Sequence, residues 1–306
     1  MRKILTISPL LLLFYLATSA LFPFTQGIEA SDSRIWTSAS RLPTDTETLR
    51  PSLKVLSLNV AHGRGQALNQ VLVAKKNIRD NLDKISALLR HSEADIVALQ
   101  EADKASLWSG LFDHAEAIAE SAGYTWKAHA AHANSWLYNY GTAVLSRLPM
   151  TTMHSHHFTP SPPTLPKGFV VSEIQWRHPG VPEQSLPIDV VSVHLDFLSE
   201  SARHKQMNEM IEVLSQRQHP MIVLGDFNSE WQAKESPVQA LAQRLNLKAY
   251  HPLVSNLSTH QDRRIDWILL SADFKFKNYA VLTDIVSDHL AVVAEVELDE
   301  NALVAI

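Results

Sequence analysis

Apolar residues recur along this chain in two patterns, and the pattern separates strands from helices. Short runs rich in valine, isoleucine and leucine are typical of buried strands. Apolar residues three or four positions apart, as at Ile78, Leu82 and Ile85, predict an amphipathic helix. Strands are predicted at 54–60, 95–100, 142–146, 169–176, 188–195, 221–224, 265–270, 279–285 and 291–298. Helices are predicted at 70–91, 111–122, 201–217 and 236–245.

Several predicted strands follow one another with no helix between them, and this order constrains the fold class. A purely parallel sheet needs a long crossover after each strand, so the order favours mixed sheets covered by helices. We therefore expect an α/β protein built as a layered sandwich. One domain is predicted at 53–299, followed by a C-terminal tail at 300–306.

The N-terminal segment differs from the rest of the chain. Two basic residues precede an apolar run at 4–24, which includes several small residues toward its end. This pattern is typical of a secretory signal, and the run is also long enough for a membrane anchor. Pro9 and Pro23 favour cleavage, because they weaken a long spanning helix. We expect a signal peptide or anchor at 1–30 and a linker at 31–52. The protein would be periplasmic or secreted, or membrane-anchored through this segment.

Composition excludes several kinds of chemistry. The chain has no cysteine, so it forms no disulfide, holds no thiolate zinc site and has no thiol nucleophile. Its 9 glycines do not suggest a glycine-rich phosphate loop. With 27 Lys+Arg against 32 Asp+Glu, the net charge is −5. That balance disfavours tight non-specific binding of nucleic acid, although a local groove can still be basic.

Polar residues suited to metal and phosphate chemistry lie beside five of the apolar strands. Functional residues gather at strand ends in α/β folds, because a rigid sheet aims several side chains into one cleft. Each residue alone is more simply explained as a turn or structural residue. Five clusters in one chain are hard to explain that way. They are Asn59, Gln100-Glu101, His194, Gly225-Asp226-Phe227-Asn228 and Ser287-Asp288-His289.

These clusters resemble the motifs of the endonuclease/exonuclease/phosphatase superfamily. That superfamily includes DNase I-like nucleases, AP endonucleases, neutral sphingomyelinases and inositol polyphosphate phosphatases. The most specific match is the combination of Gly225-Asp226-Phe227-Asn228 with Ser287-Asp288-His289, and weaker matches at 141–147 and 264–268 extend it over nearly the whole chain after residue 53. The resemblance implies a DNase I-like, four-layer α/β sandwich with two packed, mainly antiparallel sheets.

The resemblance also implies metal-dependent hydrolysis of a phosphate ester by water. Asn59 and Glu101 match the family's metal positions, and Asp288 matches a carboxylate near the metal. Carboxylate and amide oxygens are hard ligands, which suit Mg²⁺, or Mn²⁺ in its place, better than Zn²⁺.

The remaining matched positions imply catalytic roles. His289 corresponds to a general acid/base, and Asp266 would accept a hydrogen bond from its other ring nitrogen. Asp226 corresponds to the carboxylate that orients or deprotonates the attacking water. Asn228 would hold the phosphate or the nucleophile, and His194 would hydrogen-bond a non-bridging phosphate oxygen.

The motifs depart from those of AP endonucleases. Ala61 stands where an acidic or amide residue is usual, and Ala102-Asp103 stands where Thr-Lys usually follows the metal glutamate. The extra basic motifs of inositol phosphatases are also missing. We expect a phosphodiesterase with a nucleic acid or a phospholipid headgroup as competing substrates, and a phosphomonoesterase as the third choice. Outside enzymes, an inactive binding module is the alternative, which the full set of motif residues disfavours. No obligate protein partner is indicated.

Three segments have more than one interpretation. Segment 62–65 is either a substrate loop in which Arg64 contacts a second phosphate or a solvated turn. The aromatic residues in 124–140 suggest a loop that stacks on a base, rests against lipid or packs into the core. The histidines in 154–157 suggest a zinc cluster or a polar loop. The loop is favoured, because no carboxylate or cysteine lies nearby in sequence.

Overall fold

A computed structural model describes residues 36–37, 48–70, 73–135 and 137–300. The predicted signal or anchor at 1–30 and most of the predicted tail lie outside these residues. No helix in the described ranges is long and apolar enough to cross a membrane. Apart from β1, the described strands and helices run from 52 to 298. The exact domain limits stay predictions.

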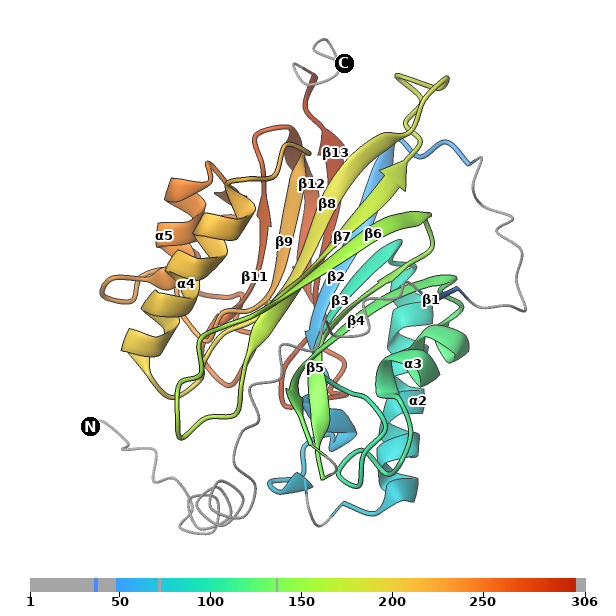
Figure 1. Cartoon of the computed structure of the whole chain (residues 1–306). Coiled ribbons are helices and arrows are strands. Elements are labelled where there is room, and N and C mark those ends of the chain that lie inside the picture. Colours follow the sequence, from blue (N-terminus) through green and yellow to red (C-terminus); the bar gives the residue numbers. More distant parts are fainter. Residues whose placement is uncertain (1–35, 38–47, 71–72, 136, 301–306) are drawn as a thin grey trace.

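The strands form two mixed sheets (Figure 1). The first has the order β1-β4-β5-β3-β2-β13-β12, and the second has the order β10-β11-β9-β8-β7-β6. Each sheet contains one parallel pair, β2 with β3 and β8 with β9, and all other pairs are antiparallel. This confirms the predicted sandwich of mixed, mainly antiparallel sheets. The first sheet comprises β1 (Trp36–Thr37), β2 (Ser52–Asn59), β3 (Ile96–Asp103), β4 (Trp126–Asn134), β5 (Asn139–Ser146), β12 (Phe274–Val281) and β13 (Val292–Leu298). The second comprises β6 (Met150–His157), β7 (Gly168–Trp176), β8 (Leu186–His194), β9 (Met221–Asp226), β10 (Lys248–Ala249) and β11 (Asp266–Leu270).

Helices cover the outer face of each sheet and complete four layers (Figure 1). Helices α2 (Lys75–Ser92) and α3 (His114–Ala122) pack on the first sheet, and α4 (Glu200–Leu214) and α5 (Pro237–Arg244) pack on the second. Side chains that accept a hydrogen bond from a first-turn amide fix three of the helix starts, as such caps commonly do. The caps are Asp113, Ser199 and Ser236.

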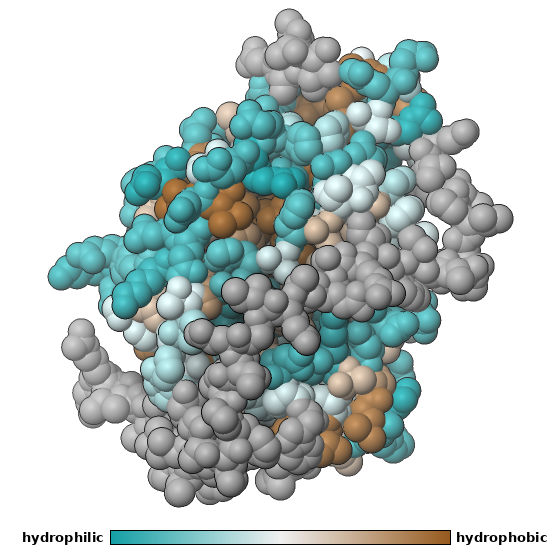
Figure 2. All heavy atoms as spheres, in the orientation of Figure 1, coloured by the Kyte–Doolittle hydropathy of each residue, from teal (hydrophilic) through white to brown (hydrophobic). Residues whose placement is uncertain are grey.

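Three apolar cores separate the layers. The central core joins the inner faces of both sheets, with Val55 and Ile96 from one and Val190 and Ile222 from the other. Two further cores lie between each sheet and its helices. Both faces of the central strands are therefore buried, which explains why their sequences are continuous apolar runs rather than alternating ones. On the molecular surface, Figure 2 shows a mostly hydrophilic face with apolar residues in small separate patches.

Two of the longer strands, β4 and β6, were not predicted from the sequence. Segment 124–140 is not a loop, because most of it forms β4 and the start of β5, with Tyr138 and Tyr140 buried in the core. The core-packing interpretation is therefore confirmed for these two residues. Alanine and histidine dominate β4, and neither is typical of strands, so the pairing with β5 determines its structure.

The second is β6, since the histidines of 154–157 belong to a strand rather than to a polar loop. Strand β6 lies at the edge of the second sheet, where one face is exposed to solvent and tolerates polar residues. No metal-binding group of three or more residues includes these histidines in the described part of the chain. Strand β12 begins at Phe274, earlier than predicted, because Lys275 and Lys277 alternate with apolar residues and hide the strand pattern.

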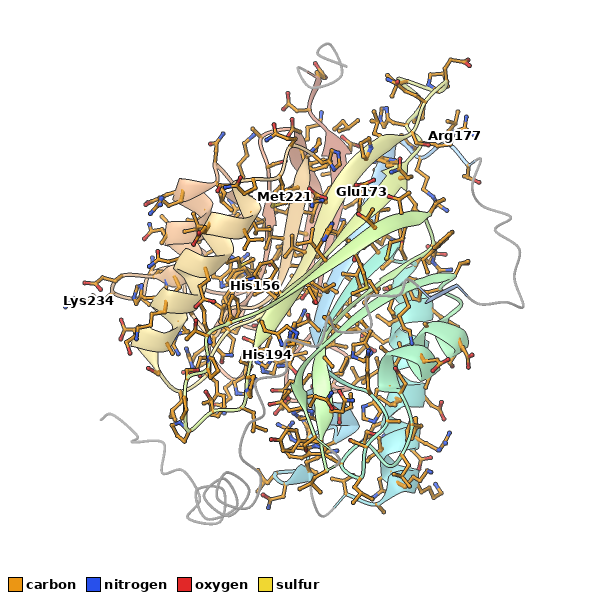
Figure 3. The ribbon with its side chains drawn as sticks, viewed as in Figure 1. His156, Glu173, Arg177, His194, Met221 and Lys234 are labelled. Atoms are coloured by element: carbon orange, nitrogen blue, oxygen red, sulfur yellow. The ribbon has the colours of Figure 1, made fainter. Side chains whose placement is uncertain are left out.

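The two parallel pairs bring four strand ends together. Strands β2 and β3 end at Asn59 and beyond Gln100, and β8 and β9 end at His194 and Asp226, which are register partners. Asn59 Nδ2 donates to Asp226 Oδ2 at 3.0 Å, so this end of one sheet touches the same end of the other. In Figure 3, His194 lies at the opposite end of the sheet from Met221, where β9 begins. The sandwich thus has one polar end.

Candidate active site

The backbone at the polar end is bent so that polar side chains turn inward. Glu101 has a φ of 51° and lies at a bulge in β3, between Gln100 and Ala102. Asn228 has a φ of 48°, after the end of β9. Left-handed backbone at non-glycine residues is costly and gathers at functional sites, and bulges re-aim side chains. The local strain therefore coincides with two predicted site residues.

Steric crowding explains why the Gly-Asp-Phe-Asn motif begins with a glycine, Gly225. Its φ is +153°, and a Cβ atom at this position would lie 2.0 Å from the backbone oxygen of Val193 on the neighbouring strand. Only glycine allows β8 and β9 to approach this closely. The close approach sets Asp226 beside His194, and Nε2 of His194 lies 3.6 Å from Oδ2 of Asp226.

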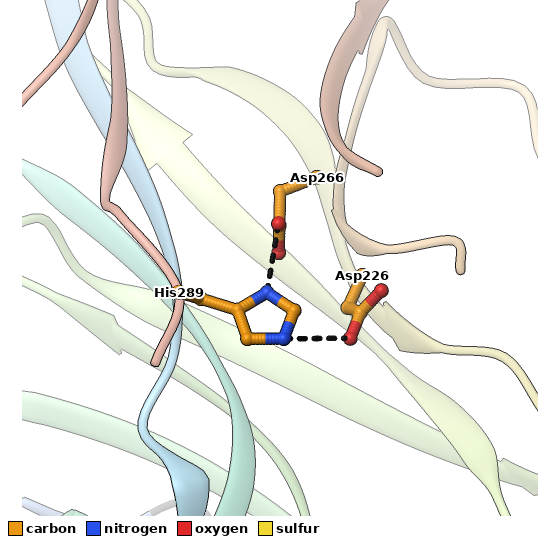
Figure 4. A group of neighbouring side chains, drawn as sticks. All are labelled: Asp226, Asp266 and His289. Atoms are coloured by element: carbon orange, nitrogen blue, oxygen red, sulfur yellow. Dashed lines mark hydrogen bonds and ion pairs between the residues drawn. The ribbon is translucent and has the colours of Figure 1, made fainter. Parts of the chain in front are cut away.

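His289 lies between two buried aspartates (Figure 4). Its Nδ1 lies 2.9 Å from Oδ2 of Asp266, and its Nε2 lies 3.8 Å from Oδ2 of Asp226. Burial alone would lower the pKa of His289, but Asp266 and Asp226 outweigh it and raise the pKa to about 10. The predicted contact between His289 and Asp266 is confirmed, and His289 is a protonated imidazole at neutral pH.

Asp226 is at the centre of the hydrogen-bond network. Burial raises its pKa, Asp266 adds to that rise, and His289 opposes it. One carboxylate oxygen accepts the amide of Asn59, and the other accepts the backbone N–H of Asn228 at 2.8 Å. The Asn228 side chain donates to the backbone oxygen of Leu195 at 3.1 Å, which ties the motif to the end of β8.

Glu101 is surrounded by cationic and imidazole groups. Its carboxylate oxygens lie 3.2 Å from Nε2 of His62, 3.6 Å from Nη1 of Arg64 and 3.9 Å from Nε2 of His194. Burial would raise the pKa of Glu101, but the nearby positive groups, His62 first and Lys167 second, hold it well below its usual range. Glu101 is therefore ionised at every physiological pH.

Arg64 bridges two predicted metal-site residues. Its guanidinium contacts the carboxylates of both Glu101 and Asp288. The side chain is mostly buried, so segment 62–65 is not a solvated turn. It forms part of the site, and contact with a second phosphate remains a prediction. The sequence did not indicate the ion pairs, because Arg64 and Asp288 are 224 positions apart.

His62 and Asp103 are two further site residues, to which the sequence assigned no individual role. Nδ1 of His62 lies 2.7 Å from Oδ1 of Asp103, and Nε2 of the same ring faces Glu101. The ring packs against Tyr140, with centroids 4.6 Å apart, and against Trp108 at 5.3 Å. With both nitrogens in contact and the ring packed against two aromatic neighbours, His62 holds the Glu101 carboxylate in one orientation.

Lys167 was not predicted from the sequence. Its ammonium is buried and lies 3.1 Å from Nε2 of His194 and 3.2 Å from Nδ1. Burial lowers the pKa of Lys167 and, together with the lysine charge, lowers that of His194 far below its usual value. His194 is therefore neutral, and one of its nitrogens can donate a hydrogen bond. Local sequence gave no signal for Lys167, which lies 27 positions before His194.

The donors near Glu101 fit a divalent metal ion. Carboxylate oxygens of Glu101 and Asp288 already face one positive group, and Asn59 ends the adjacent strand. These are oxygen ligands, the set that Mg²⁺ and Mn²⁺ prefer. The residues present therefore fit the metal that the sequence predicts.

A second group with potential metal ligands comprises Asp226, Asp266 and His289, whose ligand atoms lie within 4.8 Å of one another. Nδ1 of His289 is already bonded to Asp266, and its Nε2 points toward Asp226. A ring held between two carboxylates is better arranged to move a proton than to bind a metal. The eight predicted site residues thus form one connected cluster, in which Arg64 joins Asp288 to Glu101.

Sequence and structure comparisons identify the family. The profile of the Endonuclease/Exonuclease/phosphatase family matches residues 56–289, and the chain belongs to this family. Members of the family are phosphoester hydrolases, and they are typically dependent on divalent metals. No curated protein sequence matches the chain.

Solved structures with the same fold include three from different organisms. A family protein from Leptotrichia buccalis is 18% identical with a TM-score of 0.62, covering 80% of this chain and 100% of its own. The human Nocturnin catalytic domain with bound sulfate is 20% identical with a TM-score of 0.60, covering 87% and 98%. A mannosyl-6-phosphatase from Bacteroides thetaiotaomicron is 17% identical with a TM-score of 0.57, covering 80% and 99%. At these identities the likeness shows the shared DNase I-like fold.

Proposed function

We propose that this chain is an extracytoplasmic, Mg²⁺-dependent phosphodiesterase that hydrolyses its substrate by in-line attack of water. The observation that carries the proposal is the position of His289, 2.9 Å from Asp266 and 3.8 Å from Asp226. A protonated imidazole and a carboxylate with a raised pKa, side by side at a strand end, are the groups that acid–base hydrolysis needs.

The metal site would be formed by Asn59, Glu101 and Asp288. Mg²⁺, or Mn²⁺ in its place, supplies stabilisation of the negative charge that develops on the phosphate oxygens. Arg64 lies between Glu101 and Asp288 and adds positive charge at the same place. His62 holds Glu101 from behind, so the carboxylate is preorganised for its ligand.

Two residues carry out the proton transfers: Asp226 acts on the attacking water, and His289 acts on the leaving oxygen. Asp226 is held by Asn59 and by the backbone N–H of Asn228, so its carboxylate has a fixed orientation in which it would direct the attacking water. Its raised pKa makes it a stronger base than an ordinary aspartate. His289 carries the proton that the leaving oxygen needs, and Asp266 keeps the ring oriented.

His194 and Lys167 provide donors for the phosphate itself. His194 is buried and neutral, and Lys167 lies directly against it. Together they present an N–H group and a buried positive charge next to Asp226. Positioned donors of this kind stabilise a transition state more than they stabilise the substrate.

Export is supported by the sequence. The apolar run at 4–24 follows two basic residues, and the absence of cysteine is compatible with a periplasmic or secreted protein. A nucleic acid and a phospholipid headgroup remain the competing substrates. A phosphomonoester is the third, and the Bacteroides mannosyl-6-phosphatase of the same fold supports including a sugar phosphate in any test.

The test is a substrate panel measured with the purified protein. It contains bis(p-nitrophenyl) phosphate, plasmid DNA, RNA, dispersed sphingomyelin, mannose 6-phosphate and inositol phosphates, each with Mg²⁺, with Mn²⁺ and with chelator. We expect metal-dependent cleavage of diesters, and the best substrate defines the subfamily. Cleavage of the monoesters alone would replace the diesterase assignment. No cleavage by folded protein with either metal would favour the inactive binding module.

A further inference from the structure

Exposed apolar side chains gather at the active-site end of the molecule. Most of the large apolar side chains that are exposed in the described residues lie on loops that adjoin the strand ends carrying site residues. These loops follow β2, β3 and β8 or precede β13. The side chains are Leu68, Leu107, Leu111, Phe197, Leu198 and Ile285.

Five of these six side chains are more than half exposed. Leu68 is 96% exposed, Leu111 is 62% exposed and Phe197 is 56% exposed. A single exposed leucine is common on a soluble protein, but several large apolar residues around one functional site indicate an interaction surface.

Contacts between the loops hold these residues on one structure. Gln70 donates to the backbone oxygens of His62 and Trp108, both at 3.1 Å, and so joins the loop after β2 to the loop after β3. Lys167 lies 5.8 Å from the ring centroids of both Phe197 and Tyr140, which connects the loop after β8. The loops after β2, β3 and β8 are therefore held together at the active-site end.

Basic residues accompany the apolar ones at the start of α2. The first turn of this helix has no acidic residue, and Lys75, Lys76 and Arg79 lie in its first two turns. Positive charge at a helix N-terminus opposes the helix dipole, so this arrangement costs stability. Lys76 pairs with Asp80 at 2.6 Å, but no carboxylate of the described residues pairs with Lys75 or Arg79.

Lys75 and Arg79 instead lie over an aromatic ring of the loop that carries Leu107 and Leu111. Their charged groups are 5.9 Å and 4.3 Å from the centroid of Phe112. The apolar–basic rim thus consists of two basic side chains, both exposed, and four apolar ones. Its members are Leu68, Leu107, Leu111, Phe197, Lys75 and Arg79.

We propose that the apolar–basic rim docks the active site on an anionic lipid membrane. Aliphatic side chains at loop tips gain free energy by entering the lipid interface, and lysine and arginine are attracted to anionic headgroups. Nucleic acid would use the basic residues and stack on aromatic rings, but it offers no apolar site for exposed leucines. The apolar run at 4–24, which we predict to be an export signal or an anchor, would also bring the chain to a membrane. This proposal concerns where the protein acts, and it does not depend on which ester bond the protein cleaves.

The absence of native cysteine makes a direct test practicable. Leu68→Cys and Leu111→Cys variants of the full chain are labelled with an environment-sensitive fluorophore and mixed with phosphatidylserine-containing or purely zwitterionic vesicles. The matched control is Leu49→Cys, an exposed leucine just before β2 and therefore at the opposite end of that strand from Asn59. Leu49 is also closer in sequence to the N-terminal apolar run, so anchoring by that run would affect it first.

We expect the labels at positions 68 and 111 to shift to the blue and brighten severalfold with anionic vesicles, while the label at Leu49 stays unchanged. Reversing two charges with Lys75→Glu and Arg79→Glu should weaken the response at least about tenfold in apparent Kd, and more so at low salt. Equal responses at all three positions, or none with vesicles, would overturn the proposal. A response to single-stranded DNA or RNA in place of vesicles would overturn it in favour of nucleic acid. Because the readout needs no turnover, failure here is distinguishable from failure of the proposed hydrolysis.

Discussion

Asp226 and Asp266 are direct register partners on the antiparallel strands β9 and β11, so two buried carboxylates face each other across a strand pair. Like charges in this position repel and would destabilise the sheet. His289 enters from the first sheet and lies within 2.9 Å of one carboxylate and 3.8 Å of the other. The sheet register places two negative charges side by side, which a protonated imidazole would stabilise. The loop before β13 carries that imidazole, His289.

The titration of His289 follows from this arrangement. In the metal-free protein, ¹⁵N NMR should show the ring protonated at neutral pH and losing its proton only near pH 10, because Asp266 and Asp226 stabilise the charge. Asp266→Asn should move the pKa of His289 down toward the ordinary value near 6.5. A wild-type titration already near that ordinary value, or no change in the variant, would contradict the assigned pairing.

Gly225→Ala tests whether the motif glycine is required for strand contact. The added methyl group would lie 2.0 Å from the Val193 oxygen, and the backbone cannot move away without breaking the β8–β9 pairing. We expect a loss of roughly 2–4 kcal/mol in the free energy of unfolding, measured with urea. The control is Gly110→Ala, where the nearest neighbour is the flexible Lys75 side chain and the loss should be nearer about 1 kcal/mol. Equal losses in the two variants would refute the steric explanation.

His62 is expected to control metal affinity through Glu101. His62→Asn keeps a residue that tolerates left-handed backbone but removes the nitrogen that faces Glu101. Mn²⁺ binding, followed by electron paramagnetic resonance, should weaken about 10- to 100-fold, as is common when an outer-shell partner is lost. His156→Gln, on the edge strand β6, should bind Mn²⁺ like the wild type. Unchanged Mn²⁺ affinity in His62→Asn would remove this positioning role.

Asp113 makes a pH-dependent contribution to stability. It caps α3 and lies 3.4 Å from His129 and 3.6 Å from Lys127. Although burial would raise its pKa, His129 and Lys127 hold it well below the usual range. A depressed folded-state pKa means that the stabilisation is complete above the unfolded value, near about pH 4, and declines as the pH falls further. Asp113→Asn should therefore cost about 1–3 kcal/mol at neutral pH, and the cost should shrink below about pH 4 in urea unfolding. A cost that is the same in acid and at neutral pH would argue against an electrostatic origin.

The sequence predicted the parts of the fold that have a local signal. Apolar runs identified the buried strands, and the four α-helices of the described residues were predicted to within several residues. Strands β4 and β6 lack that signal, because Ala- and His-rich segments become strands only through pairing with β5 and β7. Their structure is imposed by the sheet and not by the propensity of their residues.

The site residues also fall into two groups, those with a local sequence signal and those without one. Asp226, His289 and Glu101 lie next to apolar strands in recognisable motifs, so the sequence alone identifies them. His62, Asp103 and Lys167 act through contacts that the fold creates. Segment 62–65 was a candidate because of Arg64, and nothing in the immediate sequence of Asp103 or Lys167 distinguishes them from ordinary polar residues. The sequence singles out Arg64 as a candidate, but its link to Asp288 depends on the packing of distant loops.

The central claim is tested most directly by the turnover of bis(p-nitrophenyl) phosphate in Mg²⁺ by wild type, His289→Gln and Asp226→Asn. The control is His156→Gln, a histidine of the same chain that lies outside the site and pairs with Glu209. We predict that chelator abolishes turnover and that each site variant loses at least about 10²-fold in kcat/KM. The control should stay within about twofold of wild type, since surface changes of this kind have small effects. Turnover that survives chelation, or that is unchanged in both site variants, would contradict the account.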